Sequence, residues 1–287
     1  MKFVSDHYFH IGHEHVISGT PCQDHALSFS EDKRAGAIVS DGCSSGKETD
    51  MGARIITFST LQAMKSVHEG EYKFAETIKK TSQQKRSEAS ELLGLTREDL
   101  LATRLSLYVN EEEIFVHLEG DGVIVVKYGD GSSSLYRYDW AENTPCYPAY
   151  DEDAFVSFIE NQASYEQQGL TETLCEINDG TRVISENLIP LEEGIHGVTK
   201  QFVHKEGRPI SLVAIISDGV TRIDGLDWVL AVEAILSFKN IHGQFVKRRL
   251  LRLQKEWAKK GIVPQDDIAL GVVATYYEGE NHDTHQE

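Results

Sequence analysis

The stretch Leu212-Val213-Ala214-Ile215-Ile216-Ser217-Asp218-Gly219 places a carboxylate and a glycine directly after an apolar run that is typical of a buried strand. The run Ala37-Ile38-Val39-Ser40 delivers Asp41 and Gly42 in the same way, and a third apolar run starts immediately after Gln265-Asp266-Asp267. Gln23-Asp24 forms a fourth acidic stop. Carboxylates gathered at a core edge repel one another unless cations hold them. Because all these ligands are oxygens, the pattern predicts one site for hard divalent ions such as Mg²⁺ or Mn²⁺.

The composition favours a soluble globular protein and argues against several classes of partner. The 287 residues include 28 Lys and Arg against 46 Asp and Glu, a formal net charge of −18. This charge repels a phosphate backbone, so we expect no nucleic acid partner. No stretch approaches the length of a membrane span, and we expect no membrane partner. The four cysteines are Cys22, Cys43, Cys146 and Cys175. They are widely spaced and form no C-x-x-C pair, which favours free thiols and a cytoplasmic location.

Hydrophobic periodicity predicts both strands and helices. The opening stretch from Phe3 to Val16 is interpreted as a strand that Gly19-Thr20-Pro21 ends before Asp24. Further strands are expected over 26–30, 35–40, 100–109, 114–118, 123–128 and 268–273. Helices are expected from about Thr49 and over 72–93, 228–236 and 246–260.

Domain organisation follows from the absence of repeats and linkers. We expect a single domain over residues 1–278 and a disordered tail over 279–287. Residues 128–209 are the least regular part, with many turn residues, and we expect them to contain additional strands and a mobile, exposed flap.

Five short motifs occur in a fixed order along the chain. They are Gly19-Thr20-Pro21-Cys22-Gln23-Asp24, Val39-Ser40-Asp41-Gly42, Gly120-Asp121, Ile216-Ser217-Asp218-Gly219 and Asp266-Asp267-Ile268. Each is weak alone, but the ordered set resembles the type 2C (PPM-type) metal-dependent serine/threonine protein phosphatases, in their bacterial-like branch. The resemblance spans almost the whole chain. It implies an α+β fold, a four-layer α-β-β-α sandwich of two antiparallel sheets flanked by helices, with a binuclear metal centre at one end.

The resemblance also implies roles for the acidic residues. Asp41 would bridge two Mg²⁺ or Mn²⁺ ions, Asp218 and Asp266 would bind the first ion, and the main-chain carbonyl of Gly42 would bind the second. Asp24 would bind directly or through a water molecule. The two ions would deprotonate a bridging water, and the resulting hydroxide would attack phosphorus without a side-chain nucleophile.

Two further residues are candidate ligands. Asp121 lies at the position of the family's Gly-Asp motif and would hold a third, weaker metal ion together with Asp218. Asp267 stands where an Asn is common in the family, so Asp266 and Asp267 are alternative ligands. For Asp121 an ordinary hairpin tip at Glu119-Gly120-Asp121-Gly122 is an equally good interpretation.

The first motif departs from the family pattern. Many members have an acidic residue directly before the first Asp and an Arg five positions before it, whereas this chain has Gln23 and Gly19. The first motif therefore lacks one carboxylate and the phosphate-binding cation of the family, and Arg34, Lys47 or Arg54 are candidates for the missing cation.

Simple structural roles explain the other conspicuous residues. The spacing of His7, His10, His13 and His15 matches no standard zinc pattern, so they are interpreted as ordinary strand or loop residues. The basic run over 247–260 is interpreted as the solvated face of a helix.

The sequence therefore leads to two functional hypotheses. The first is a metal-dependent phosphatase that hydrolyses phosphoserine and phosphothreonine in proteins, with a role in signalling and a phosphorylated protein as its substrate. The alternative is a weakly active or inactive phosphatase-like module that binds a phosphorylated partner. Gly19 and Gln23 motivate the alternative.

Overall fold

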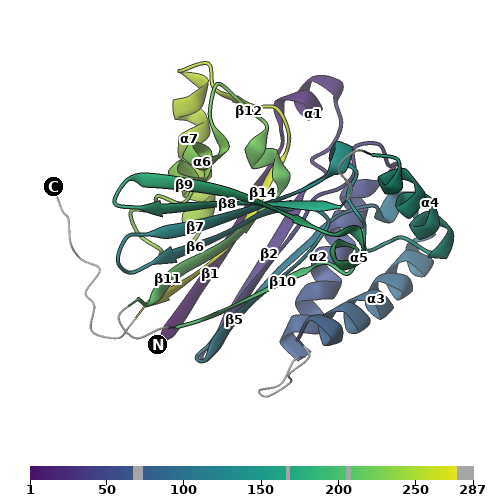
Figure 1. Cartoon of the computed structure of the whole chain (residues 1–287), viewed down its shortest axis with the longest axis horizontal. Coiled ribbons are helices and arrows are strands. Elements are labelled where there is room, and N and C mark those ends of the chain that lie inside the picture. The colour runs from purple at the N-terminus through teal and green to yellow at the C-terminus, as the bar shows by residue number, and fades with distance from the viewer. Residues whose placement is uncertain (67–73, 166–168, 205–207, 277–287) are drawn as a thin grey trace.

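The computed structural model describes residues 1–66, 74–165, 169–204 and 208–276 and contains two large antiparallel sheets (Figure 1). Across the seven-stranded sheet the order is β1 (Lys2–His10), β14 (Ile268–Tyr276), β11 (Ile210–Ile216), β6 (Gly122–Tyr128), β7 (Ser133–Trp140), β8 (Leu170–Asn178) and β9 (Thr181–Ile189). Across the five-stranded sheet the order is β10 (Val198–Val203), β5 (Glu113–Glu119), β4 (Arg104–Asn110), β3 (Arg34–Ser40) and β2 (His25–Glu31). Two short strands pair with each other: β12 (Ile223–Asp224) and β13 (Val263–Pro264).

Helices cover the outer faces of both sheets. The α-helices are α1 (His13–Ser18), α2 (Thr49–Ser66), α3 (Phe74–Leu93), α4 (Glu152–Ala163), α5 (Leu191–Gly194), α6 (Trp228–Ile235) and α7 (Phe245–Ala258). Single 3₁₀ turns occur at η1 (Glu98–Leu100), η2 (Ala141–Asn143) and η3 (Asp218–Thr221). α2 packs on the five-stranded sheet with α3 beside it, whereas α6 and α7 lie over the seven-stranded sheet (Figure 1). The four-layer α-β-β-α sandwich predicted from the sequence is confirmed.

Burial on both faces explains the continuous apolar runs of the central strands. In β11, Val213 and Ile215 point into the core between the sheets, while Ala214 and Ile216 pack toward α6 and α7. In β3, Val39 likewise belongs to the core between the sheets, and the neighbouring Ile38 packs under α2. Side chains alternate between the two faces of a strand, so a strand covered on both faces needs apolar residues at every position.

The strand registers bring the acidic stops to one end of the sandwich. His25 pairs with Ser40, so the residue before β2 and the residue after β3 are neighbours. In the other sheet Ile216 pairs with Leu270, which places the end of β11 beside the start of β14. Asp24, Asp41, Asp218 and Asp266 follow or precede these strand ends.

The expected strand from Phe3 to Val16 is wrong in its second half. β1 ends at His10, and the helix α1 follows it. A tertiary contact explains the helix, because the Glu14 N–H in α1 donates to the Gln265 carbonyl at 3.0 Å. The chain then leads from α1 to Asp24. Gly19 ends α1 with φ 75°, a left-handed conformation that glycine adopts easily.

The hairpin interpretation of Glu119-Gly120-Asp121-Gly122 is also wrong. β5 and β6 pair in different sheets, so the chain crosses from one sheet to the other at Gly120 and Asp121. Local sequence could not show this, since a turn between two strands looks the same whether or not the strands pair. The crossing brings Asp121 to the end of the sandwich where the other carboxylates gather.

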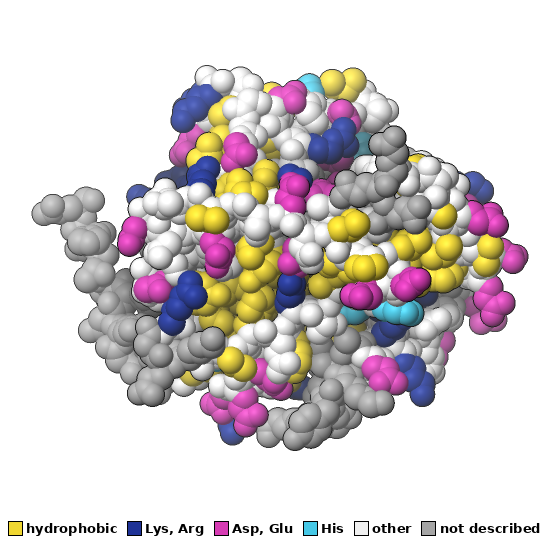
Figure 2. Space-filling model, in the orientation of Figure 1, with side chains coloured by type: hydrophobic (Ala, Val, Ile, Leu, Met, Phe, Trp, Pro, Cys, Tyr) yellow, Lys and Arg dark blue, Asp and Glu magenta, His cyan; other side chains and the backbone are white. Residues whose placement is uncertain are grey.

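Residues 128–209 are more regular than expected. They supply β7, β8 and β9 to one sheet and β10 to the other. β9 is an edge strand whose side chains are almost all exposed, Val183 and Ile184 among them. Figure 2 shows hydrophobic side chains in the middle of this face of the molecule, with charged side chains around them. A mobile flap and a single domain over 1–278 stay predictions, and the tail over 279–287 lies outside the described residues.

Other features agree with the sequence analysis. The helices expected from Thr49 and over 72–93, 228–236 and 246–260 correspond to α2, α3, α6 and α7. All four cysteines are free. In the described part of the chain no helix has the length and hydrophobicity needed to cross a membrane.

The core between the sheets provides a test of the fold. Leu107 is 0% exposed in this core, whereas Leu92 on α3 is 85% exposed. We predict that Leu107→Ala lowers the free energy of unfolding by about 2–5 kcal/mol through the cavity that it leaves. The matched variant Leu92→Ala should change it by less than about 0.5 kcal/mol. Urea unfolding of both variants measures the difference, and equal stabilities would contradict the assigned core.

Candidate metal centre

Four carboxylates gather at the end of the sandwich, contributed by both sheets. Asp24 and Asp121 are only 2% and 4% exposed, and Asp41 and Asp218 are partly buried. Burial and the mutual repulsion of these groups raise the pKa of all four carboxyl groups, the largest cause being burial in each case. The charges of Asp24 and Asp218 act on Asp41, and the charge of Asp218 acts on Asp121. The charge of Arg222 acts in the opposite direction on Asp218, but the pKa of this carboxyl group is still raised.

Short contacts fix the carboxylates in this cluster. Asp41 and Asp218 are hydrogen-bonded to each other through their side chains. The Ser217 hydroxyl donates to Asp24 Oδ2 at 2.7 Å, and the same Ser217 oxygen accepts the Ala269 N–H at 2.9 Å. Ser217 thus links the end of β11, the start of β14 and the carboxylate that precedes β2.

Two glycines next to the carboxylates are required by close backbone packing. A Cβ atom on Gly219 would lie 1.8 Å from the Asp267 carbonyl oxygen, and one on Gly42 would lie 2.8 Å from the carbonyl oxygens of Gln23 and Thr49. No side chain fits at either position. The Asp-Gly pairs therefore bring Asp41 and Asp218 to the site on tightly packed backbone.

Asp266 faces a cation at the rim of the cluster. Its Oδ2 accepts from Arg222 Nη1 at 2.5 Å, and Arg222 Nη2 also pairs with Glu14 at 3.0 Å. The Asp266 side chain is 24% exposed, and its charge acts on Asp218 and Asp24. Its Oδ1 accepts the Asp267 N–H at 2.9 Å, so both oxygens of Asp266 have partners although the side chain is only partly buried.

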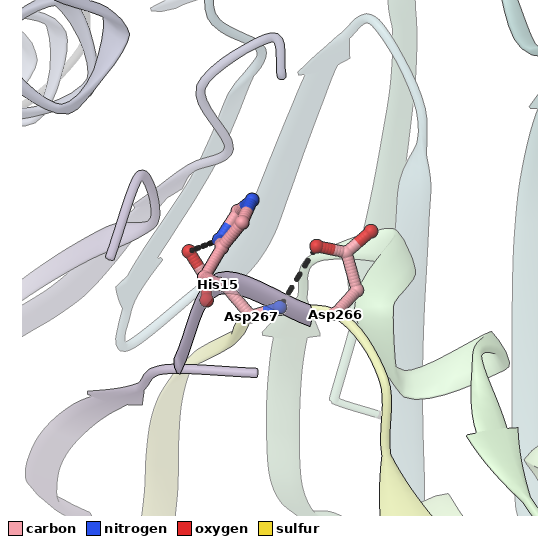
Figure 3. Close-up of side chains that lie close together, drawn as sticks. All are labelled: His15, Asp266 and Asp267. Atoms are coloured by element: carbon pink, nitrogen blue, oxygen red, sulfur yellow. Dashed lines mark hydrogen bonds and ion pairs between the residues drawn. The ribbon is translucent and has the colours of Figure 1, made fainter. Parts of the chain in front are cut away.

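Asp267 makes different contacts (Figure 3). Its side chain is 2% exposed; Oδ1 accepts the Gly12 N–H at 2.6 Å and Oδ2 accepts the Gln23 N–H at 2.6 Å. His15 Nδ1 lies 2.9 Å from Oδ2. Both oxygens of Asp267 thus hold the chain segment that leads to Asp24.

His15 is a residue that the sequence analysis treated as ordinary. Its ring, Asp266 and Asp267 offer ligand atoms that all lie within 4.8 Å of one another, and Figure 3 shows the imidazole over Asp267 with Asp266 alongside. The position of His15 in the chain could have indicated this contact, because α1 directly precedes the first motif and packs against the last motif, Asp266-Asp267-Ile268. Spacing among the histidines alone could not reveal this contact.

The structure clarifies the departures in the first motif. The buried Gln23 side chain donates from Nε2 to the Thr49 hydroxyl at 2.7 Å, and its Oε1 has no hydrogen-bond partner among the described residues. A buried, unpaired amide oxygen is suited to a hard cation or its water. Gly19, at the position of the expected Arg, ends α1.

Of the three candidates for the missing phosphate-binding cation, Arg34 is wrong. Arg34 begins β3 and pairs with Glu31, whereas Asp41 follows the other end of this strand, about 20 Å away at the rise of an extended chain. Arg54 lies on α2 over the Phe9 ring, 5.8 Å from its centre. For Lys47 the structure gives no contact with the carboxylate cluster.

Comparisons with known proteins agree with this geometry. The family model described as protein phosphatase 2C matches residues 11–263. The chain belongs to the protein phosphatase 2C family. A comparison with curated protein sequences gave no significant match.

Several solved structures share the protein phosphatase 2C fold. The serine/threonine phosphatase of S. agalactiae is 14% identical, with a TM-score of 0.57 over 96% of this chain and 100% of that one. The Mycobacterium tuberculosis serine/threonine phosphatase PstP/Ppp is 12% identical, with a TM-score of 0.52 over 96% of this chain and 100% of that one. A C. elegans sex determining protein is 13% identical, with a TM-score of 0.55 over 96% of this chain but 65% of that one.

We predict that Asp266 and Asp267 have separable roles in this protein phosphatase 2C domain. Asp267→Ala leaves two buried backbone N–H groups without their acceptor, and we expect a loss of about 1–3 kcal/mol of stability per unpaired donor. Asp266→Ala breaks a partly exposed ion pair and one part-buried hydrogen bond from the Asp267 N–H, so the loss should be about 1 kcal/mol and smaller than that of Asp267→Ala. Urea unfolding of the metal-free variants measures both values.

Metal binding provides the complementary measurement. Asp266→Ala should weaken Mn²⁺ binding in a calorimetric titration even though the variant remains stable. If Asp266→Ala destabilised the metal-free protein more than Asp267→Ala does, the two roles would be reversed.

Proposed function

We propose that this protein is a metal-dependent protein phosphatase that removes phosphate from phosphoserine and phosphothreonine in proteins. The observation that carries the proposal is the cluster of four carboxylates at the junction of the two sheets. Membership of the protein phosphatase 2C family supports a phosphatase activity on phosphoproteins. We further propose a cytoplasmic, single-domain signalling enzyme whose partner is its phosphorylated substrate, with no nucleic acid or membrane partner.

The donor set fits Mg²⁺ or Mn²⁺, because it consists of carboxylate and carbonyl oxygens. In our assignment Asp41, Asp218 and Asp266 would hold the first ion, and Asp41 and the Gly42 carbonyl would hold the second. Asp24 would take part directly or through water. Gln23, the residue directly before it, has a buried Oε1 without a hydrogen-bond partner among the described residues, and many family members have an acidic residue at this position. When bound, the ions would acidify water and neutralise the phosphoryl oxygens.

Asp121 and Asp267 are assigned roles outside the two-ion centre. Asp121 is the candidate for a third ion together with Asp218, since its carboxyl group is influenced by Asp218. Asp267 was a candidate ligand as well, but its two oxygens accept backbone N–H groups, so we assign it the positioning of the segment before Asp24.

The proposed chemistry requires no side-chain nucleophile. Cys22 lies beside the cluster, where burial and the charges of Asp24 and Asp267 raise the pKa of its thiol. A histidine could supply a proton to the leaving group. In the described part of the chain, no histidine is in direct contact with the four carboxylates.

The alternative function is a phosphatase-like module that binds a phosphorylated partner without efficient turnover. Gly19 and Gln23 favour it, since Gly19 supplies no cation for the phosphate and Gln23 no charge for the second metal ion. The two functions differ in turnover, which makes them separable by one set of kinetic measurements.

We predict metal-dependent hydrolysis of p-nitrophenyl phosphate and of a phosphothreonine peptide after chelation and addition of Mn²⁺ or Mg²⁺. Asp41→Asn and Asp218→Asn should each lower kcat/KM by about 100-fold or more, as expected when a preorganised electrostatic contact is lost. Asp227→Asn, which removes a carboxylate at the cap of α6, is the control and should retain activity.

The kinetic result separates the hypotheses. Full activity in Asp41→Asn or Asp218→Asn would overturn the assigned centre. Tight binding of the phosphopeptide without turnover would favour the binding module.

A further inference from the structure

A cavity of about 160 Å³ lies beside the carboxylate cluster. It is bounded by α3, the start of β4, the end of β5 and the segment before α4. Gly120, which directly precedes Asp121, and Tyr147 form part of its wall. Burial and the charges of Cys43, Asp121 and Asp41 raise the pKa of the Tyr147 hydroxyl. Tyr147 therefore separates the cavity from the candidate metal centre.

The wall of this cavity is cationic. Lys79 and Arg86 lie seven residues apart on α3, about two helical turns, and so project from the same face of the helix. Arg104, at the start of β4, is 3% exposed and contributes a third positive charge. Glu119 is the one carboxylate among the described residues that line the cavity. This excess of cations is unusual in a chain with a net charge of −18.

Both carboxylate oxygens of Glu119 pair with cations of the cavity wall. Its Oε1 lies 3.3 Å from Lys79 Nζ, and its Oε2 accepts from Arg104 Nη2. Arg104 Nη1 donates to the Ser82 hydroxyl, but Arg104 Nε is buried without a hydrogen-bond partner in the described part of the chain. Among those residues Arg86 makes neither a hydrogen bond nor an ion pair. The donors of Arg86 are thus left for a further acceptor, while Arg104 contributes a buried positive charge to the wall.

The charge of Arg86 also favours an anion in the cavity. Burial and repulsion by Arg104 lower the pKa of Arg86 to about 10, so this guanidinium remains protonated at neutral pH while its positive charge is only partly compensated. An anion in the cavity would compensate the charge and supply acceptors for the unpaired donors.

We propose that the cavity is a phosphate-binding subsite, in which Arg86 and Arg104 with Lys79 hold a phosphoryl dianion other than the one at the metal centre. Planar guanidinium groups match the oxygens of phosphate, and a dianion balances more of the excess charge than a carboxylate does. Glu119 and Asp121 are two residues apart, a span of at most about 7 Å. A second phosphorylated residue a few positions along a bound peptide reaches the cavity at this separation, and a free small phosphate fits the same chemistry.

Binding is tested first without metal ions, so that the result does not depend on the proposed function. Inorganic phosphate is titrated calorimetrically into the EDTA-treated full chain. We expect Arg86→Gln to weaken binding by about tenfold or more, as for the loss of one hydrogen bond to a charged group. Lys85→Gln, which changes the same charge on the same helix outside the cavity, is the control and should bind as the wild type does.

Lys79→Gln provides a second variant at a partly exposed position, with Lys80→Gln as its control. Thermal unfolding of every variant checks that the fold is retained. Failure of the wild type to bind phosphate, or equal binding by Arg86→Gln and Lys85→Gln, would overturn the proposal.

The source of the phosphate is distinguished with metal present. This arm rests on the proposed phosphatase function and compares kcat/KM for peptides with one and with two phosphorylated residues. A preference for the second phosphate that Arg86→Gln abolishes identifies the peptide as the source, while p-nitrophenyl phosphate turnover stays unchanged. Phosphate binding that depends on Arg86 without such a preference identifies a free small phosphate. Loss of all turnover with binding intact would contradict only the phosphatase function.

Discussion

The repulsion among carboxylates at the junction of the two sheets is the constraint on which the rest of the structure depends. Asp41 follows β3 of the five-stranded sheet, and Asp218 follows β11 of the other sheet. Asp121 lies where the chain crosses between the sheets, so the three charges meet where the layers meet. Without cations, burial and the repulsion among these groups raise their pKa values. Divalent ions held by these carboxylates would compensate their charges, and the same ions would then provide the chemistry. Stability and proposed function therefore rest on one arrangement of charges.

A second interaction sets the geometry of this cluster. Asp267 accepts backbone N–H groups from Gly12 and Gln23 and pairs with His15, which holds the amino-terminal segment against the start of β14. Ser217 adds a link from β11 to Asp24. Buried hydrogen bonds of this kind orient ligand carboxylates in metal sites. The first and last motifs of the sequence are thus joined physically, although 244 positions separate Gln23 from Asp267.

Much of this fold could be predicted from the sequence, because apolar runs such as 212–216 mark strands covered on both faces. Their acidic ends indicated the site, since buried carboxylates need partners. Long-range contacts could not be predicted. The alternation through Val16 indicated a strand, but contacts with Gln265 and Asp267 impose a short helix. The crossing at Gly120 and the pairing of Arg222 with Asp266 likewise depend on residues that are distant in the chain.

The most direct test of the account is anomalous scattering from crystals grown with Mn²⁺, since it locates the ions independently of activity. The account predicts two Mn²⁺ ions at the end of the sandwich, with Asp41 bridging them and carboxylate oxygens of Asp218 and Asp266 directly coordinated to the first. Asp267 should still accept the Gly12 and Gln23 N–H groups. A metal-free cluster at saturating Mn²⁺, with Asp41 and Asp218 still hydrogen-bonded to each other, would contradict the account.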